Sequence, residues 1–103
     1  VATLTACPGK PELLISSPAA SRSDASVDFE VMLSCIPCST ATILLTPVRD
    51  GIIGANMFIS LSKTQLSTTV TVTIGSEDEL GLALVWSQGL RYSQAQGDVV
   101  FSD

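Results

Sequence analysis

The chain has 103 residues, a length that fits one domain and argues against two, so we expect residues 1–103 to fold as a single domain. Hydrophobic residues make up 46% and charged residues 15%, which excludes a chain that is disordered by composition. Ten acidic residues against five scattered basic ones give a net charge of −5, so we expect no binding to nucleic acid.

The longest apolar stretches are far too short to span a bilayer, so the sequence predicts no membrane insertion. The chain begins without a methionine, a basic segment or the apolar run of a signal peptide. We therefore expect a mature product or an excised domain.

The first third of the chain contains the most regular alternation. Residues 13–15 lie between two prolines and predict a short edge strand, and the Ser-, Ala- and Pro-rich residues 16–26 predict a loop. Residues 26–35 predict a strand with one buried and one solvent-facing side. Its inward residues are predicted to be Val27, Phe29, Val31, Leu33 and Cys35. The opposite side is polar except for Met32.

The middle of the chain predicts two more strands. Residues 40–46 are β-branched or apolar and should end at Pro47, while the short link 36–39 has the length of a hairpin connection. Turn signals from residue 49 to 56 predict a loop. Residues 57–62 predict a short strand in which Phe58 shares its side with two serines.

The last third alternates again. In residues 67–74 the valines and Ile74 should face inward and the threonines outward, before an acidic turn at 75–79. Residues 80–87 suit a strand or a short helix, and their context favours a strand. A final strand is predicted at 99–101. About seven short strands, with a turn signal about every ten residues, predict an all-β, antiparallel immunoglobulin-like β-sandwich.

Three cysteines in a small acidic chain predict secretion and one disulfide. Cys7 bonded to Cys35 would tie the N-terminal segment to a central strand, and Cys7 bonded to Cys38 is the alternative. A Cys35–Cys38 bond would close too small a loop to constrain the fold. A redox dithiol at Cys35 and Cys38 would need a following helix, and a zinc site would need a fourth ligand.

The chain contains no histidine, which removes the commonest general base and the Ser-His-Asp and Cys-His mechanisms. We therefore expect no enzyme and no cofactor. The acidic turn Glu77, Asp78 and Glu79, with Asp50 or Asp98, offers weak calcium candidates, although a plain acidic turn is the simpler interpretation. No other metal site is expected.

Trp86 and Tyr92 are the single indole and the single phenol of the chain. We expect Trp86 to belong to the core of a sandwich of this size. As the alternative, Trp86 and Tyr92 would contact a ligand on a sugar- or protein-binding surface.

The stretch from residue 27 to about residue 81 resembles the β-sandwich repeats of large extracellular proteins, the Calx-beta and immunoglobulin-like adhesion modules. The resemblance rests on Val-Asp-Phe-Glu-Val-Met-Leu-Ser at 27–34, a Pro-containing link, and Ala-Thr-Ile-Leu-Leu-Thr at 41–46. It continues with Phe-Ile-Ser-Leu-Ser at 58–62 and the threonine-rich run at 68–74, which leads into the acidic turn. The cysteines do not frame Trp86 as they do in antibody-like domains, and the resemblance transfers no binding residue.

We expect a non-enzymatic extracellular or cell-surface module, a structural or adhesive unit of a larger protein or fibre. Its partners would be neighbouring domains or protein subunits, with segments 1–26 and 98–103 available to pair with a neighbour. The alternative is a carbohydrate-binding module that holds glycans through Trp86 or Tyr92.

Overall fold

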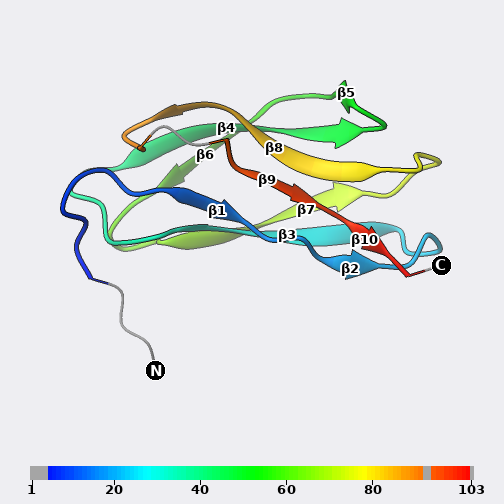
Figure 1. Cartoon of the computed structure of the whole chain (residues 1–103), viewed down its shortest axis with the longest axis horizontal. Coiled ribbons are helices and arrows are strands. Elements are labelled where there is room, and N and C mark those ends of the chain that lie inside the picture. Colours follow the sequence, from blue (N-terminus) through cyan, green and yellow to red (C-terminus); the bar gives the residue numbers. More distant parts are fainter. Residues whose placement is uncertain (1–4, 92–93, 103) are drawn as a thin grey trace.

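The alternation of polar and apolar residues along the chain produces an all-β protein. The computed structural model describes residues 5–91 and 94–102, and the elements in these ranges are ten strands (Figure 1). The described strands form seven pairs, of which six are antiparallel, as predicted, and one short pair is parallel. Within the described ranges no helix could cross a membrane.

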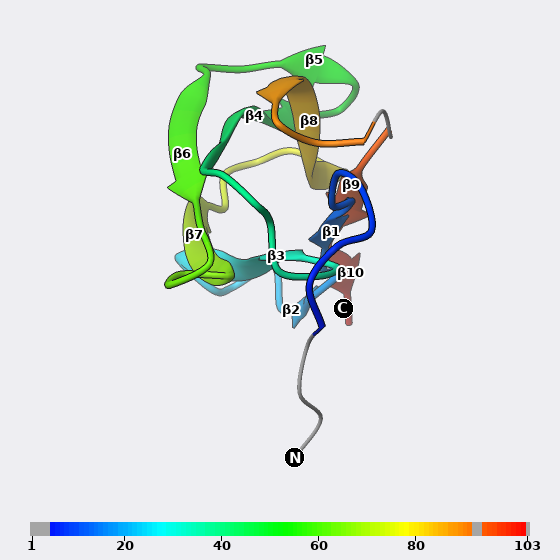
Figure 2. The same ribbon diagram turned by 90° about the vertical axis from the view of Figure 1, so that its left-hand side faces the viewer.

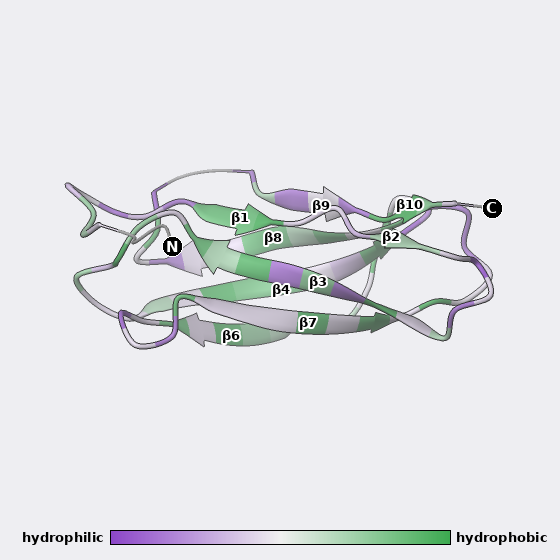
Figure 3. Ribbon diagram, turned by 90° about the horizontal axis from the view of Figure 1, so that it is seen from below, coloured by the Kyte–Doolittle hydropathy of each residue, from purple (hydrophilic) through white to green (hydrophobic). Residues whose placement is uncertain are grey.

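The smaller sheet has three strands in the order β1 (Leu13–Ile15), β3 (Ser26–Leu33) and β7 (Ser67–Thr73). Side chains of β3 are buried and exposed in strict alternation, which confirms the predicted inward and outward sides of this strand. β7 buries Val70 and Val72 and exposes the threonines between and beside them, also as predicted. The alternation is visible as changing colour along β3 in Figure 3.

The larger sheet has five strands built around β4 (Ala41–Arg49). One side of β4 pairs with β8 (Leu80–Gln88), which in turn pairs with β9 (Gln96–Asp98). The other side of β4 pairs with β6 (Met57–Leu61) and then with the short β5 (Ile52–Ile53). The region 80–87, which suited either a strand or a helix, is therefore a strand.

The two sheets enclose one apolar core (Figure 2). Its largest fully buried side chains come from both sheets. They are Phe29, Val31, Leu33, Ile43, Leu45, Leu61 and Leu82. Thr46 is equally buried but lies on the outer side of β4, opposite Ala83. The hydroxyl of Thr46 donates a hydrogen bond to the Gly54 carbonyl at 3.0 Å, so this buried polar group is satisfied.

One side of the molecule is closed by a strand pair that the sequence did not predict. β2 (Ala19–Ala20), inside the predicted loop 16–26, pairs in parallel with β10 (Val100–Phe101). The predicted final strand at 99–101 contains β10, whereas β9, directly before it, was not predicted and belongs to the larger sheet. The opposite side carries β6 and β7 (Figure 2), and each has one edge without a strand partner in the described chain.

Pro47 does not end its strand, contrary to the prediction. β4 continues to Arg49, and the Pro47 carbonyl accepts a hydrogen bond from the Gly54 amide at 2.8 Å. The nitrogen of Pro47 points to that same side, where β4 changes partner between β6 and β5. No ladder hydrogen bond is lost there, so the proline is tolerated inside a central strand.

Two other local predictions were wrong. The link 36–39 is not a hairpin connection, because β3 and β4 lie in different sheets and the link crosses between them. The predicted loop 49–56 contains β5, whose two residues pair with the end of β4.

Gly97 offers a test of how closely the sheets approach on the closed side. A Cβ at Gly97 would lie 2.0 Å from the Ser16 carbonyl oxygen, whereas a Cβ at Gly9 would meet nothing within 4 Å. We expect Gly97→Ala to lower the free energy of unfolding by about 2 kcal/mol through overpacking. Gly9→Ala should stay within about 0.5 kcal/mol of the unmodified protein. Urea unfolding followed by tryptophan fluorescence measures both, and an equal effect of the two variants would contradict this account.

Candidate functional site

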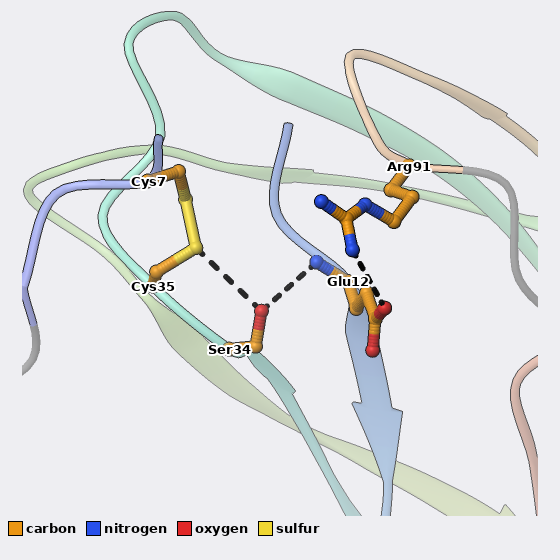
Figure 4. Close-up of a disulfide and its surroundings, with 5 residues drawn as sticks. All are labelled: Cys7, Glu12, Ser34, Cys35 and Arg91. Atoms are coloured by element: carbon orange, nitrogen blue, oxygen red, sulfur yellow. Dashed lines mark hydrogen bonds and ion pairs between the residues drawn. A yellow bond between two sulfur atoms is a disulfide. The ribbon is translucent and has the colours of Figure 1, made fainter. Parts of the chain in front are cut away.

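A disulfide ties the N-terminal segment to the end of β3. Cys7 and Cys35 are bonded, with a Cα–Cα distance of 5.2 Å and a sequence separation of 28 (Figure 4). The backbones are paired there as well, since the Cys7 amide donates to the Ile36 carbonyl and the Ile36 amide donates to the Thr5 carbonyl. Cys7 is therefore bonded to Cys35, and the alternative bond from Cys7 to Cys38 is not formed.

Cys38 is an exposed free cysteine in the link between β3 and β4. Because Cys35 is bonded to Cys7, a dithiol of Cys35 and Cys38 is not formed in this structure. The hydroxyl of Ser34, beside Cys35, accepts a hydrogen bond from the Glu12 amide at 2.9 Å (Figure 4). The disulfide thus belongs to a structural joint between the start of the chain and β3.

The acidic turn between β7 and β8 forms a second joint, at the other end of the molecule. Glu77 is buried and forms an ion pair with Arg49 at the end of β4. The same guanidinium donates to the Thr73 carbonyl at 2.8 Å. Arg22 donates from the loop before β3 to the carbonyls of Glu77 and Asp78, at 3.1 and 3.0 Å. Three separate segments are held together at this turn.

The pKa of the Glu77 carboxyl is lowered. Burial by itself raises it, but hydrogen bonds from the amides of Glu77 and Gly75 and the charge and hydrogen bond of Arg49 outweigh that effect. The carboxylate is therefore stabilised in its ionised form. It acts as an acceptor for the turn and for Arg49.

The remaining calcium candidates also bind protein groups. One Asp50 carboxylate oxygen accepts hydrogen bonds from the Asp78 and Glu79 amides, at 2.9 and 2.8 Å. Asp98 accepts a hydrogen bond from the Gln96 side chain at 3.0 Å. Asp78, Glu79 and Asp98 line a shallow depression of about 380 Å³. In residues 5–91 and 94–102 no group of three acidic, cysteine or histidine side chains is placed to hold a metal ion.

Trp86 is exposed rather than part of the core, contrary to the expectation. Leu80, Leu82 and Leu84 face inward, and simple alternation would place Trp86 with them. The pairing of β8 with β4 shifts, however, so that Leu44 lies opposite Trp86 while Leu45 lies opposite Leu84. Val85 is the extra residue of this β-bulge, and the bulge moves every following side chain to the other face.

The bulge creates an apolar row across the outer face of the larger sheet. Phe58 of β6 and Trp86 of β8 both lie directly opposite Leu44 of β4. Their exposed fractions are 74% for Phe58 and 47% for Trp86, while Leu44 between them is half-buried. Residues directly opposite each other on neighbouring strands share one face, so the three side chains form one continuous row. We call these three residues the apolar row.

Uncharged side chains surround the apolar row. The adjacent cross-strand row consists of Ser60, Thr42 and Gln88. β4, β6 and β8 contain a single charged residue, Arg49 at the end of β4, and its guanidinium is paired with Glu77. The other sheet differs, because Asp28 and Glu30 lie on its solvent-facing side. On the larger sheet, the exposed carboxylate of Asp98 in β9 shares the outer face with the apolar row, but it lies beside Gly81, at the opposite end of β8 from Trp86.

Of the two aromatic residues predicted as ligand contacts, the structure places only Trp86. Tyr92 lies outside the described residues. Phe58 and Leu44 were missed as members of a contact surface, although a signal for Phe58 was present. Its side of the strand carries serines, while Ile59 and Leu61 occupy the inward side. A large aromatic residue on the polar side of a strand has no core to fill.

The terminal segments pair within the chain itself. β1 pairs with β3 and β2 pairs with β10, so much of segments 1–26 and 98–103 is already used in the described structure. Within the described residues, β6 and β7 each keep one edge without a strand partner, as do the shorter edge strands β1, β5 and β9. Comparison with protein-family models and with curated proteins gave no match to this chain.

The disulfide should contribute to stability mainly by restricting the unfolded chain. A disulfide between cysteines 28 residues apart stabilises the folded state by roughly 3–4 kcal/mol in the chain-entropy estimate. We expect Cys7→Ser to lower the free energy of unfolding by about that amount, measured in urea without reductant. Cys38→Ser is the matched control, and it should change stability by less than about 0.5 kcal/mol because Cys38 is exposed. A comparable loss in both variants would contradict a structural role specific to Cys7.

Glu77 should make the stability of the protein depend on pH. Because its pKa is lowered on folding, its contribution is present above the ordinary pKa of a glutamate and is lost as pH falls through the lowered value. At pH 6, Glu77→Gln should reduce the free energy of unfolding by about 2 kcal/mol, through the loss of charge-assisted hydrogen bonds. As pH falls below the lowered pKa of Glu77, the variant and the unmodified protein should converge.

Urea unfolding at a series of pH values measures this difference. Glu30→Gln, on the exposed side of β3, is the matched control and should follow the unmodified protein. A Glu77→Gln variant with an undiminished stability difference at low pH would show that the carboxylate charge is not the cause.

Proposed function

We propose that this chain is a non-enzymatic immunoglobulin-like sandwich module of a larger extracellular protein, and that it acts through protein contacts on the outer face of its larger sheet. The observation that carries the proposal is the apolar row of Phe58, Leu44 and Trp86, exposed on three strands whose one charged residue, Arg49, is paired with Glu77. Exposed apolar surface that is contiguous is uncommon on proteins without a binding partner. Aromatic residues are also enriched at the centres of protein interfaces.

The topology supports the immunoglobulin-like assignment. The chain crosses between the sheets after β3, returns after β6 and crosses again after β7, which leaves β3 and β7 in one sheet and β4, β8 and β9 in the other. This is the order in which strands B, E, C, F and G of immunoglobulin-like domains are distributed. The disulfide differs from the one in antibody domains, because it joins β3 to the N-terminal segment rather than to the opposite sheet.

The disulfide also supports an extracellular location. Structural disulfides form and persist in oxidising compartments and are rare in reducing ones. With about 100 residues, a domain of this kind gains a large share of its marginal stability from one such bond.

A carbohydrate-binding module is the second candidate, and one observation favours it. The polar row of Thr42, Ser60 and Gln88 runs beside the apolar row. An indole can stack on the apolar face of a sugar while neighbouring hydroxyl and amide groups bind its hydroxyls. Saturable changes in Trp86 fluorescence with cellohexaose or chitohexaose, abolished in Trp86→Ala, would favour this candidate over the first.

Photo-crosslinking tests the protein-contact proposal. We expect p-benzoylphenylalanine in place of Phe58, in the module incubated with extracellular and cell-surface proteins of its source, to form adducts with a second polypeptide on irradiation. The same probe at Thr69, exposed on the outer side of β7, is the control and should form few adducts. Equal adducts from both positions, or none from either, would contradict the proposed use of this face.

A further inference from the structure

The three residues of the apolar row are arranged symmetrically on the outer face of the larger sheet. This arrangement indicates the kind of partner that the face binds. Leu44 lies at the centre of the apolar row, with Phe58 one strand away on one side and Trp86 one strand away on the other. Neighbouring strands are about 4.8 Å apart, so the two aromatic side chains stand at nearly equal distances from Leu44.

From this arrangement we propose that the face binds a second copy of the same chain, in a symmetric dimer with the two larger sheets stacked face to face. This inference rests on the proposed function, since it names the partner of the same surface. A two-fold axis between the copies and parallel to β4 places Leu44 against Leu44. The same axis places each Phe58 against the Trp86 of the other copy, which makes both halves of the contact identical.

The distribution of charge supports a second copy of this acidic chain as the partner that binds the outer face of the larger sheet. A protein with a net charge of −5 repels itself wherever its acidic groups meet. Asp28 and Glu30, however, lie on the outer side of the smaller sheet, on the far side of the core from the apolar row. Stacked sheets lie about 10 Å apart, so these acidic faces would be about 30 Å apart across the dimer, beyond the screening length of about 8 Å in physiological salt. The acidic groups that meet are those of the turns beside the end of β4, which the axis places at the same end of both copies. We therefore expect the dimer to strengthen as salt screens them.

The size of the face is sufficient for a weak dimer. β4 and β8 have nine residues each. β6 has five residues and β9 has three. At about 3.3 Å per residue and about 4.8 Å per strand, these four strands together cover about 410 Å². Two such faces would bury about 800 Å², in the range of weak and transient interfaces. The dimer is therefore expected to dissociate in the micromolar range rather than the nanomolar range.

A competing apolar surface lies on the smaller sheet. Leu14 and Met32 lie opposite each other and, with Leu66, line a depression of about 400 Å³. Asp28 and Glu30 lie on the same side of β3 as Met32. Stacking two copies there would bring like charges together, which makes this surface a suitable control rather than a second candidate.

Sedimentation velocity of the purified chain, from about 1 to about 200 μM, tests the proposal. A Cys38→Ser background excludes dimers linked through the exposed cysteine and keeps the Cys7–Cys35 bond intact without reductant. We expect a reversible monomer–dimer equilibrium. Trp86 is the only tryptophan, so its emission should shift to shorter wavelength over the same concentration range.

Substitutions on the two faces locate the contact. Phe58→Glu is fully tolerable for the fold because Phe58 is 74% exposed, and it should weaken the dimer at least about thirty-fold. Met32→Glu, on the other sheet, should leave the dimerisation constant unchanged within about two-fold.

A charge pair tests the two-fold axis itself. Phe58→Glu and Trp86→Lys should each weaken the dimer when present alone. When the two variants are mixed, one glutamate faces one lysine and the second contact remains native, so a mixed dimer should form. Recovery in the mixture is expected only if Phe58 of one copy faces Trp86 of the other.

Three results would overturn the inference: a monomer at every concentration, a dimer that survives Phe58→Glu, or a dimer that forms with no change in Trp86 emission. A chain that is monomeric when pure but still forms adducts with other proteins from position 58 would overturn the dimer alone and leave the proposed function standing. A monomer without such adducts would overturn both.

Discussion

The structure depends on the burial of one apolar core between two sheets, to which the longer strands each contribute one side. β3, β7 and β4 present alternating side chains, and their inward residues meet in a single cluster. Because the side-chain period of a strand is two, a slip of one residue would expose the whole inward set. The register of both sheets follows from this constraint. The single bulge between β4 and β8 is the place where the register changes.

A disulfide at one end of the molecule and an ion pair at the other fix the chain segments that the core does not hold. The disulfide holds the N-terminal segment against the link that leaves β3, and the Arg49–Glu77 pair holds the turn between β7 and β8, at opposite ends of the long axis (Figure 1). Both joints lie where the chain passes from one sheet to the other. The core of a domain of this size is small, so the crossings between the sheets gain little stability from further apolar burial. The covalent and charge-assisted contacts hold the chain in place there instead.

The same bulge links the fold to the proposed function. It turns Trp86 away from the core and sets it in line with Leu44 and Phe58, on a sheet face with almost no charge. The acidic groups are instead concentrated on the other sheet and in the turns. A contact surface of this type is a property of the assembled sheet, because its three residues come from three strands that are distant in sequence.

The sequence by itself determined the strand-rich fold, the inward and outward sides of β3 and β7, and the presence of a disulfide. Each of these is encoded locally, in alternation along one strand or in composition. The sequence also carried a signal for Phe58, an aromatic residue on the polar side of its strand. It did not reveal that Pro47 lies within β4, that β2 pairs with β10, or that the link after β3 crosses between sheets.

Those features, and the outward position of Trp86, were decided only by the tertiary structure. Pro47 is tolerated because β4 changes partner beside it, and two-residue strands such as β2 are formed only by their partner. Trp86 follows three inward leucines at the spacing of a core residue, and nothing local marks Val85 as the residue at which β8 bulges. A bulge arises from the fit of one strand against another, so the side chains that it exposes become known only when both strands are in place.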